Sequence, residues 1–537
     1  MRQYLFFVLF SVLLSATGLE AGTPPEFLWA KGTGGSSDDY GNAVAVDSVG
    51  NSVQAGSFTG TGSFLGTNLV SSGVDDIYLF KLNSNGALLW ARRAGGSGSD
   101  EAYAVTLDST GNAFVAGRFT GTAAFGSTNL VSAGTHDMFL AKYDVDGNFL
   151  WARRAGGTNT DYANGVSADA NGNVFVTGVF SSAANFGGVT LTNAGNKDIF
   201  IAKYDGAGNF LWARRAGSTG TDVGFNVAAD RFGNAYITGW FVFTANFGGA
   251  NFTALGAQDA FLAKYDSAGN FLWLRQSGGS AAYDYGYSVA VDSAGNPHVS
   301  GSFRSTANFS GSSLTSSGSA DIFLAKYSTN GTFLWAQKAG APDASAPFKA
   351  NDDEGYSVAV DGQGNAILTG YINGTANFSG TSISSISADQ DIFIAKYSTN
   401  GTLSWVLRAG GSGGSDYGNS IALDANGNAY LTGAFYGAAT FGTNNVTSVG
   451  LRDVYATKVS TMAVAATPPV ISDVTDKILN EDAASGAIPF TVSDAETPAP
   501  NLIVAASASN STLLPASSLV LGGSGGNRTL TITPPTN

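Results

Sequence analysis

The sequence predicts an all-β chain, in which a seven-bladed β-propeller closed by its N-terminal strand is followed by a partial β-sandwich. Three observations support this fold class. Glycine (72 of 537 residues) and aromatic residues (12%) are abundant, as in short strands joined by tight turns. One unit repeats along most of the chain. The first and last copies of that unit are incomplete in complementary ways.

Tryptophan marks the repeat. Seven of the eight tryptophans recur at steps of 61 or 62 residues, except for a step of 70 before the last one. Each lies in a stretch like Phe149–Arg154, which we interpret as the fourth strand of a unit with the tryptophan in a structural role. The repeated tryptophans are Trp29, Trp90, Trp151, Trp212, Trp273, Trp335 and Trp405.

Each unit carries four strand signals. The first strand is short and apolar and ends at the turn Asp-x-x-Gly-Asn, as at Asp169. A second strand, Val174–Phe180, is followed by a longer loop, and the third strand contains Asp-x-(Phe/Tyr)-x-x-Lys. The fourth strand carries the tryptophan. Four antiparallel strands, repeated seven times, are typical of a β-propeller.

The two ends of the repeat region predict closure. The first unit begins with a lone fourth strand, Phe27–Lys31, and the last unit has only three strands, ending near Lys458. We expect the N-terminal strand to complete the seventh blade, because this pairing removes an exposed sheet edge. A repeated phenylalanine is expected to fill the core between blades: Phe64, Phe125, Phe186, Phe247, Phe309, Phe378 and Phe441.

The lysine of the third strand has an expected partner. First and third strands end on the same face of the disc, so we predict an ion pair between each lysine and a turn aspartate, within about 4 Å. The lysines are Lys81, Lys142, Lys203, Lys264, Lys326, Lys396 and Lys458. The turn aspartates are Asp47, Asp108, Asp169, Asp230, Asp292, Asp361 and Asp424.

A second aspartate precedes every first strand. We expect these residues to brace the loops through hydrogen bonds to the backbone, since a residue present in all units serves a need of all units. The alternative is a ring of carboxylates that attracts cations. No cofactor is predicted, with calcium as the alternative at these or the turn carboxylates. The candidate metal ligands are Asp39, Asp100, Asp161, Asp222, Asp284, Asp353 and Asp416.

The repeated motifs resemble a known family. Trp-Ala-x-x-Ala-Gly-Gly, Asp-x-x-Gly-Asn and Asp-Ile-Phe-x-Ala-Lys-Tyr are similar to the bacterial beta-propeller repeats called SBBP, over roughly Glu26–Ser460. The resemblance implies the fold and a bacterial source. It implies no catalytic residues, and the fold by itself supplies no function.

The segments outside the repeats predict export and a further module. Met1–Ala21 has the charge, the short apolar core and the small-residue end of a signal peptide, so we expect a secreted or cell-surface protein. The predicted divisions are 1–21, a propeller at 22–460, a linker at 461–469 and a module at 470–537. No other segment is expected to span a membrane.

The final module resembles Ig-like or cadherin-like sandwiches. Its expected strands are Ile488–Asp494, Leu502–Ala506, Ser518–Leu521 and Thr529–Thr533. Such sandwiches have about 100 residues, and only about 70 are present here. We therefore hypothesise that the gene is truncated and that the natural protein continues.

Several classes of chemistry are disfavoured. The chain has no cysteine, which excludes disulfides and thiol catalysis, and its net charge of −14 argues against nucleic acid as a partner. His136 and His298 fall at different positions of the repeat, so we expect structural roles for both. No serine nucleophile elbow, Walker loop or His-Glu-x-x-His motif is present.

A ligand site should break the symmetry of the repeat, and the sixth unit does so with an insertion near Ala341–Asp353. The plainer interpretation is a longer solvent loop beside a locally packed tryptophan. The candidate ligand-binding residues are Trp240, Tyr283, Tyr287, Phe348, Lys349, Asp352, Asp353 and Glu354.

These observations favour a non-catalytic binding, adhesion or scaffold protein, monomeric, whose partner is a cell-surface protein or a polysaccharide. One alternative is an extracellular carbohydrate-active enzyme that uses the propeller mouth, which needs a set separation between two carboxylates. Another is a structural spacer that binds no ligand.

Overall fold

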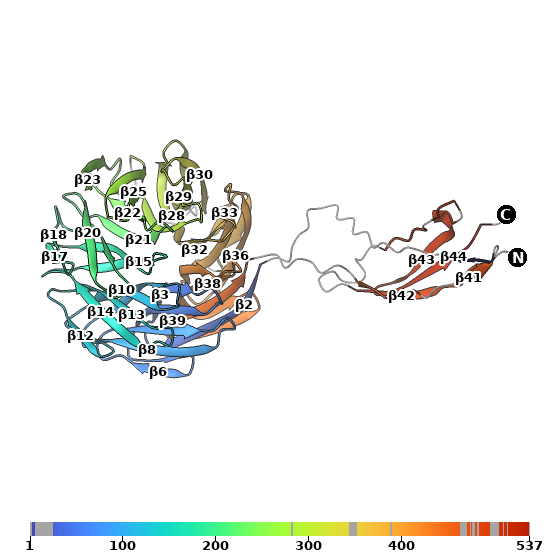
Figure 1. Ribbon diagram of the computed structural model, residues 1–537, viewed down its shortest axis with the longest axis horizontal. Helices are drawn as coiled ribbons and strands as arrows, with labels where there is room; N and C mark the ends of the chain where they lie inside the picture. Colours follow the sequence, from blue (N-terminus) through green and yellow to red (C-terminus); the bar gives the residue numbers. More distant parts are fainter. Residues whose placement is uncertain are drawn as a thin grey trace. The chain divides into compact units, whose positions relative to one another are not determined.

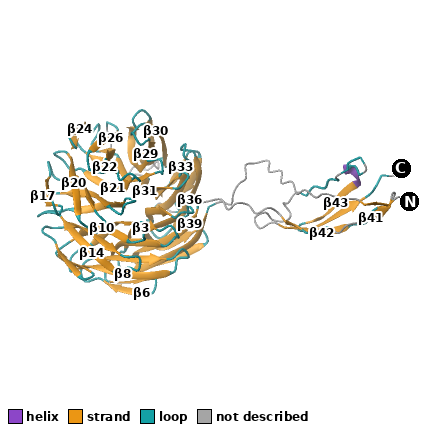
Figure 2. Cartoon of the chain, in the orientation of Figure 1, coloured by secondary structure: helices purple, strands orange, loops and turns teal. Residues whose placement is uncertain are grey.

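The computed structural model describes residues 3–5, 25–280, 283–342, 352–386, 389–461, 470–472, 474, 478–480, 483–493, 504–508, 510–512 and 514–535. These residues are almost entirely strand and loop (Figure 2), and the only helix among them is the short 3-10 helix η2 (Ala516–Ser518). None of the described residues belongs to a helix that is long and apolar enough to cross a bilayer. The chain divides into two compact units, Glu26–Thr461 and Met1–Pro25 with Met462–Asn537.

The larger unit consists of repeated units of four antiparallel strands, as the sequence predicts, and further strands extend several of them into sheets of six or more. The first strands are β3 (Tyr40–Val46), β9 (Glu101–Leu107), β15 (Tyr162–Ala168), β21 (Val223–Ala229), β27 (Tyr285–Val291), β31 (Glu354–Val360) and β37 (Tyr417–Leu423). The second strands are β4 (Ser52–Phe58), β10 (Ala113–Phe119), β16 (Val174–Phe180), β22 (Ala235–Phe241), β28 (Pro297–Asn308), β32 (Ala366–Asn373) and β38 (Ala429–Phe441).

The outer strands follow in the same order. The third strands are β7 (Asp76–Leu82), β13 (Asp137–Tyr143), β19 (Asp198–Tyr204), β25 (Asp259–Tyr265), β29 (Ser313–Tyr327), β35 (Gln390–Tyr397) and β39 (Asn444–Ser460). The fourth strands are β8 (Leu88–Gly96), β14 (Phe149–Ala155), β20 (Phe210–Gly217), β26 (Phe271–Ser277), β30 (Phe333–Gly340), β36 (Leu403–Gly411) and β2 (Glu26–Gly35).

The sheets of the larger unit surround a common centre, with the first strands nearest to it (Figure 1). Each first strand contacts the first strand of the next sheet, and β37 contacts β3. The N-terminal strand β2 pairs with β39 from Glu26, opposite Ser460, to Thr33, opposite Val454. The expected pairing of the two ends of the repeat region is therefore present.

The segment between the second and third strands is a hairpin, where the sequence suggested only a longer loop. Strand β5 (Thr61–Phe64) pairs with β6 (Thr67–Val70) and also with the preceding fourth strand, β2. In β28–β29 and β38–β39 the hairpin is continuous with the main strands. The others are β11 (Thr122–Phe125) with β12 (Thr128–Val131), β17 (Ala183–Asn185) with β18 (Thr190–Thr192), β23 (Thr244–Phe247) with β24 (Ala250–Thr253) and β33 (Thr375–Phe378) with β34 (Thr381–Ser384).

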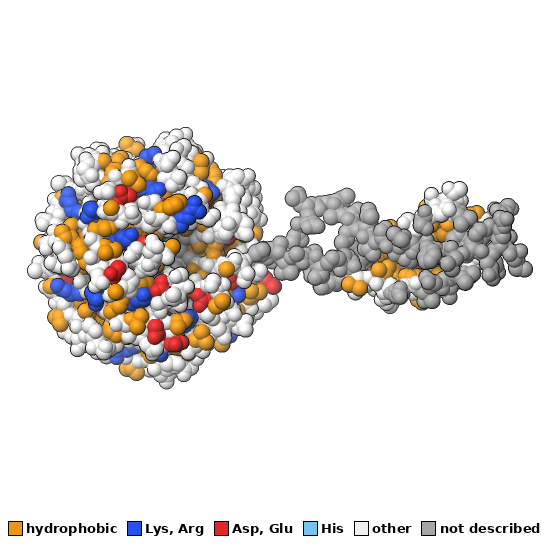
Figure 3. Space-filling model, viewed as in Figure 1, with side chains coloured by type: hydrophobic (Ala, Val, Ile, Leu, Met, Phe, Trp, Pro, Cys, Tyr) orange, Lys and Arg blue, Asp and Glu red, His pale blue; other side chains and the backbone are white. Residues whose placement is uncertain are grey.

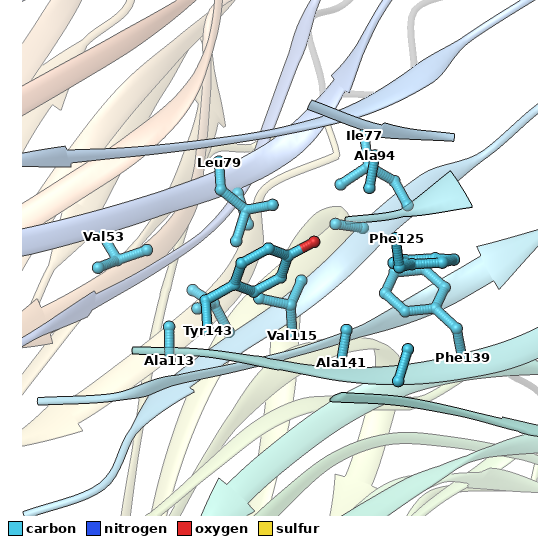
Figure 4. Close-up of a cluster of buried hydrophobic side chains, with 14 of the residues drawn as sticks. Val53, Ile77, Leu79, Ala94, Ala113, Val115, Phe125, Phe139, Ala141 and Tyr143 are labelled. Carbon is cyan, nitrogen blue, oxygen red and sulfur yellow. The ribbon is translucent and has the colours of Figure 1, made fainter. Parts of the chain in front are cut away.

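The core lies between neighbouring sheets. Figure 4 shows one interface, where Val53 and Leu79 of one sheet pack with Val115, Phe139 and Tyr143 of the next. All seven repeated phenylalanines have exposed fractions of 0–1%, which confirms their predicted burial.

The repeated tryptophans join each sheet to the next. The Trp90 indole N–H donates to the Val145 carbonyl in the following unit (3.1 Å), and Trp29, Trp151, Trp212 and Trp335 make the same contact. The turn that receives the ring requires glycine. Gly147 has a φ of +76°, and a Cβ there would lie 2.6 Å from the Trp90 ring.

The smaller unit contains β1 (Gln3–Leu5), β40 (Val470–Ile471), β41 (Ile478–Asn480), β42 (Ile488–Ser493), β43 (Leu519–Ser524) and β44 (Asn527–Ile532). Its main sheet has the order β40-β42-β44-β43. Three of the four strands expected from the sequence are present. The fourth is not, since Val504–Ala508 is irregular and residues 502–503 lie outside the described part.

Candidate functional site

The aspartates that precede the first strands are buried and brace the loops, which confirms the bracing hypothesis. Asp161 accepts the backbone N–H groups of Gly157 (2.7 Å) and Ser181 (2.8 Å), so it ties the loop before β15 to the end of β16. All seven accept two such bonds. Among the residues that the structure describes, no group of three or more His, Cys, Asp or Glu side chains is placed to hold a metal ion.

Burial has an electrostatic consequence for these aspartates. It raises the pKa to about 6 at Asp100, Asp161 and Asp222, because the charged form loses water that two backbone donors replace only in part. The pKa is raised to about 7 at Asp39, Asp284 and Asp416, and to about 8 at Asp353. These carboxyls therefore titrate near neutral pH.

The predicted lysine–aspartate pairs are present in every unit, at 3.0–3.9 Å between Nζ and Oδ2. In the third unit, the side chains of Lys203 and Asp169 are only 7% and 1% exposed. Lys142 also donates to the Gly206 carbonyl of the next unit (3.2 Å). The pairs therefore serve the fold and supply no free charge to a ligand.

The first strands enclose a central cavity of about 280 Å³. Each contributes the residue at its β-bulge or the residue after it. The lining residues are Asn42, Ala43, Tyr103, Ala104, Val105, Asn164, Val166, Phe225, Asn226, Tyr287, Ser288, Tyr356, Ser357, Asn419 and Ser420.

The bulge position is asparagine in three units and aromatic in four. Each asparagine amide donates to a backbone carbonyl of the next unit: Asn42 to Ala102 (2.9 Å), Asn164 to Gly224 (2.9 Å) and Asn419 to Gly41 (3.0 Å). An aromatic ring cannot replace this amide bond. The aromatic units thus depart from the bracing pattern. Tyr103 stands between two asparagine units, whereas Phe225, Tyr287 and Tyr356 belong to three consecutive units on one side of the cavity.

An uninterrupted series of ring contacts follows that side. The centroid distances are 6.1 Å for Trp240–Tyr285, 5.8 Å for Tyr285–Tyr287, 5.2 Å for Tyr287–Tyr356, 5.5 Å for Tyr356–Tyr371 and 5.4 Å for Tyr371–Tyr417. Most pairs meet edge to face, the arrangement that aromatic quadrupoles favour. We call this series the aromatic arc: Trp240, Tyr285, Tyr287, Tyr356, Tyr371 and Tyr417.

Glu354, the first residue of β31, lies within the arc. Burial raises its pKa, and side-chain hydrogen bonds from Tyr356 and Tyr287 oppose that rise. Asp352 is two residues earlier and is held by Arg304, whose Nη2 lies 2.8 Å from Oδ2. The arc thus combines aromatic rings with the carboxylate of Glu354. The neighbouring carboxylate, that of Asp352, is already paired with Arg304.

The structure brings some of the sequence-predicted ligand residues together and leaves others apart. Trp240, Tyr287 and Glu354 come together in the arc, with Asp352 beside them. Asp353 is 0% exposed and accepts two backbone N–H groups, the same bracing contacts that the other aspartates of its set make. Tyr283 is 49% exposed, and its backbone forms a bridge with Gln258. Phe348 and Lys349 lie outside the described residues.

Sequence reasoning missed Tyr285, Tyr356, Tyr371, Tyr417 and Arg304. The sequence did contain an indication of this site, in the residue that begins the first strand of each unit. When the units are aligned, these seven residues form one column. That column holds tyrosine in most units but glutamate in two of them. Comparing the units position by position would have singled out those two.

Neither histidine belongs to this site. His298 is 0% exposed and edge-on to Trp335 (5.9 Å), and burial lowers its pKa to about 3. Burial also lowers the pKa of His136, whose carbonyl accepts the N–H of Asp161. Both contacts agree with the structural roles expected from the sequence.

Charged side chains of both signs are interspersed on the face of the larger unit shown in Figure 3. A second cavity, of about 620 Å³, lies beside Asp38, Tyr436 and Arg452. The Arg452 guanidinium lies over the ring of Tyr417, 5.5 Å from its centroid. The arc therefore ends at this basic side chain, in the sheet that contains the N-terminal strand.

Two curated proteins resemble parts of the chain. An uncharacterized WD repeat-containing protein of Acanthamoeba polyphaga mimivirus is 28% identical over 443 residues, which are 67% of this chain and 32% of that protein. The regulatory protein FlaEY of Caulobacter vibrioides is 29% identical over 141 residues, 26% of this chain and 15% of its own length. The chain thus spans about a third or less of either relative.

Solved structures resemble it at low identity. Sqt1 from Chaetomium thermophilum is 11% identical, with 80% of this chain and 87% of that chain covered and a TM-score of 0.37. The Pan2 WD40 domain of Neurospora crassa is 9% identical, with coverages of 79% and 97% and a TM-score of 0.36.

The family comparison agrees with the repeated sheets. The profile described as "Beta-propeller repeat", SBBP, matches residues 89–118, 150–179, 211–240 and 404–434. Each match runs from the fourth strand of one unit into the second strand of the next. The chain therefore contains beta-propeller repeats of the SBBP family.

Proposed function

We propose that this beta-propeller repeat protein is a secreted or cell-surface binding protein without catalytic activity, and that its partner binds at the mouth of the central cavity. The observation that carries the proposal is the aromatic arc with Glu354. The repeated tryptophans, ion pairs and loop-bracing aspartates keep one residue type in every unit. The positions of the arc vary between units, and in units four to seven their rings join in one uninterrupted series. Such departures are expected at functional sites.

The proposal includes a closed propeller of seven blades. The pairing of β2 with β39 supports it, as do two contacts between the last sheet and the first. Asn419 donates to the Gly41 carbonyl (3.0 Å), and Trp29 of the last sheet donates to the Ser84 carbonyl (3.1 Å). Closure would bring the rings of units four to seven to one opening.

Export and display are part of the same proposal. We infer a bacterial protein that a signal peptide at 1–21 directs out of the cytoplasm, and a final Ig-like or cadherin-like module that displays the propeller. Before the signal peptide is cleaved, β1 pairs with β41. Cleavage after Ala21 would remove this strand and leave the edge of β41 free. The partner would be a cell-surface protein or a polysaccharide, bound by a monomer.

A binding isotherm tests the proposal. We expect the labelled full chain to bind saturably to intact cells or to a purified cell-surface polysaccharide. Trp240→Ala should weaken that binding, while Phe232→Ala should not. Phe232 is an aromatic of the same unit, 64% exposed, in the turn at the other end of the sheet. Non-saturable binding, or equal effects of both changes, would instead favour a spacer that binds no ligand.

The alternative is an extracellular carbohydrate-active enzyme that uses the propeller mouth. It rests on Asp352 and Glu354, two carboxylates two residues apart with different surroundings. Release of reducing ends from a polysaccharide, abolished in both Asp352→Asn and Glu354→Gln, would replace the binding proposal with this one.

A further inference from the structure

Two glutamates occupy one position of the repeat. Glu101 begins β9 in the second unit, and Glu354 begins β31 in the sixth. The residues opposite them on the second strand also share one repeat position, since each directly follows the glycine of its strand. These residues are Arg118, opposite Glu101, and Tyr371, opposite Glu354.

In the second unit, the carboxylate has a built-in cation. Arg118 Nη2 lies 2.6 Å from Glu101 Oε1, and the Tyr103 hydroxyl donates to Oε2 at 2.6 Å. The guanidinium carbon also lies 5.7 Å from the centroid of the Tyr103 ring. Carboxylate, phenol and guanidinium therefore form a complete group, with a charge-assisted hydrogen bond and a cation–π contact.

The sixth unit repeats this group without the cation. Glu354 and Tyr356 stand where Glu101 and Tyr103 stand, but tyrosine replaces the arginine. The basic side chain that acts on Glu354 is Arg304, and its guanidinium is already bonded to Asp352 (2.8 Å). What replaces the missing cation is more aromatic surface: the rings of Tyr287 and Tyr371 lie 5.2 and 5.5 Å from that of Tyr356.

The space beside this group limits what can bind. Tyr287 and Tyr356 also line the central cavity of about 280 Å³. Pockets for drug-sized ligands have volumes of about 300–1,000 Å³, so this one suits a single side chain or a small amine rather than a sugar chain. The net charge of −14 attracts cations to the molecule as a whole.

We propose that the sixth unit binds an organic cation, the guanidinium or ammonium group of an arginine or lysine side chain on a partner polypeptide. Glu354 takes the position that Glu101 has toward Arg118, and the rings of Tyr287, Tyr356 and Tyr371 surround the bound group. This inference rests on the proposed function, since it identifies the chemistry that the mouth of the cavity recognises.

Titration calorimetry of the full chain tests the inference with a blocked arginine, N-acetyl-arginine methylamide. We expect saturable binding with one site per chain. The citrulline analogue, which has a similar shape but no charge, should not bind. Glu354→Gln should weaken binding by about tenfold or more, the loss expected from one charge-assisted hydrogen bond. Glu101→Gln, the matched control at the same repeat position, should leave the affinity unchanged.

A second variant tests the comparison between units directly. Tyr371→Arg should supply the missing cation from within the chain, as Arg118 does, and should abolish binding of the arginine probe. Near-ultraviolet circular dichroism checks that each variant keeps its packing. If Tyr371→Arg does not fold, Glu354→Gln with its matched control decides the question.

Three results would overturn the inference: equal binding of the arginine and citrulline probes, an unchanged affinity in Glu354→Gln, or an equal loss in Glu101→Gln. Tighter binding of spermidine than of the peptide probe would identify a free amine as the source of the cation. Binding of a neutral hexasaccharide instead would favour a polysaccharide partner. If the chain binds cells saturably but the arginine probe does not compete, the proposed function stands and only its cation chemistry is wrong.

Discussion

Charged residues in this protein serve mostly to hold the repeat together. Each lysine of a third strand pairs with the turn aspartate of its own unit, and several also donate to the next unit's turn. The same turn aspartates accept backbone N–H groups, as Asp169 does from Asn171 and Asn173 (2.9 Å each). Burying the lysine and the aspartate costs free energy, because both charges lose water. Their mutual attraction offsets this cost only while both side chains are present.

Removing one partner should therefore be costly. Lys203→Met is expected to lower the free energy of unfolding by about 3–5 kcal/mol, because it leaves the Asp169 carboxylate buried without its cation. The double variant with Asp169→Asn should recover part of this loss. Urea unfolding followed by tryptophan fluorescence measures both. A loss below about 1 kcal/mol in the single variant would show that the pair behaves as an exposed one.

The buried aspartates predict how stability depends on pH. A carboxyl with a raised pKa contributes stability below about pH 4, its value in the unfolded chain, and loses it as pH rises through about 6–8. Three turn aspartates act in the opposite direction, because the pKa is lowered at Asp108, Asp292 and Asp361. The pKa of Asp108 is lowered to about 2, so its contribution is present above about pH 4 and is lost as pH falls through 2.

Together these groups place the stability maximum at about pH 4, since the lowered carboxyls contribute above it and the raised carboxyls contribute below it. The thermal midpoint should fall by several degrees between pH 5 and pH 8. Asp222→Asn should reduce this dependence, because the amide stays neutral where the carboxyl titrates. Differential scanning calorimetry at several pH values measures the midpoint. A midpoint that rises from pH 5 to pH 8 would contradict the assignment.

Residue-level prediction worked where every unit shares an environment. Lys203 and Asp169 were identifiable because their spacing recurs and both strands end on one face. Glu354 was identified as an exception, through the insertion that precedes it. Glu101 was missed, although it occupies the same position of the repeat. The two glutamates differ in their cross-strand partners, and these follow only from the register of the strands. Arg118 lies opposite Glu101, and Tyr371 lies opposite Glu354.

At the scale of elements, the hairpins add strands to the sheet of the preceding unit. Strand β23 pairs with β20 and carries Phe247, whose ring lies 5.0 Å from that of Phe261 on β25. These hairpins were not predictable, since a four-residue strand such as Thr244–Phe247 shows too little alternation to separate it from a loop. The phenylalanine inside it was predictable, because it recurs in every unit.

Truncating that ring should destabilise the protein strongly. Phe247→Ala is expected to lower the free energy of unfolding by about 3–5 kcal/mol, through lost burial and the cavity left behind. Phe247 is 0% exposed, whereas the control residue Phe232 is 64% exposed. Phe232→Ala should change stability by less than about 0.5 kcal/mol. Similar losses in both variants, measured by urea unfolding, would contradict the packing described.

At the scale of the whole molecule, the proposed binding site depends on closure of the ring of sheets. The arc joins side chains from units four to seven, and its last ring, Tyr417, belongs to the unit that β2 completes. The sequence predicts this closure from the lone strand at one end and the missing strand at the other. It does not predict the arc, because the rings come from several strands that meet only around the common centre.

A disulfide between the two ends measures closure most directly. The chain has no cysteine, so Glu26→Cys with Ser460→Cys introduces one pair, at positions that are opposite in the β2–β39 ladder. We expect an intramolecular disulfide on oxidation and a gain of about 2–4 kcal/mol in the free energy of unfolding over the reduced form. Free thiols after oxidation, or disulfides only between chains, would show that β2 does not complete the last sheet.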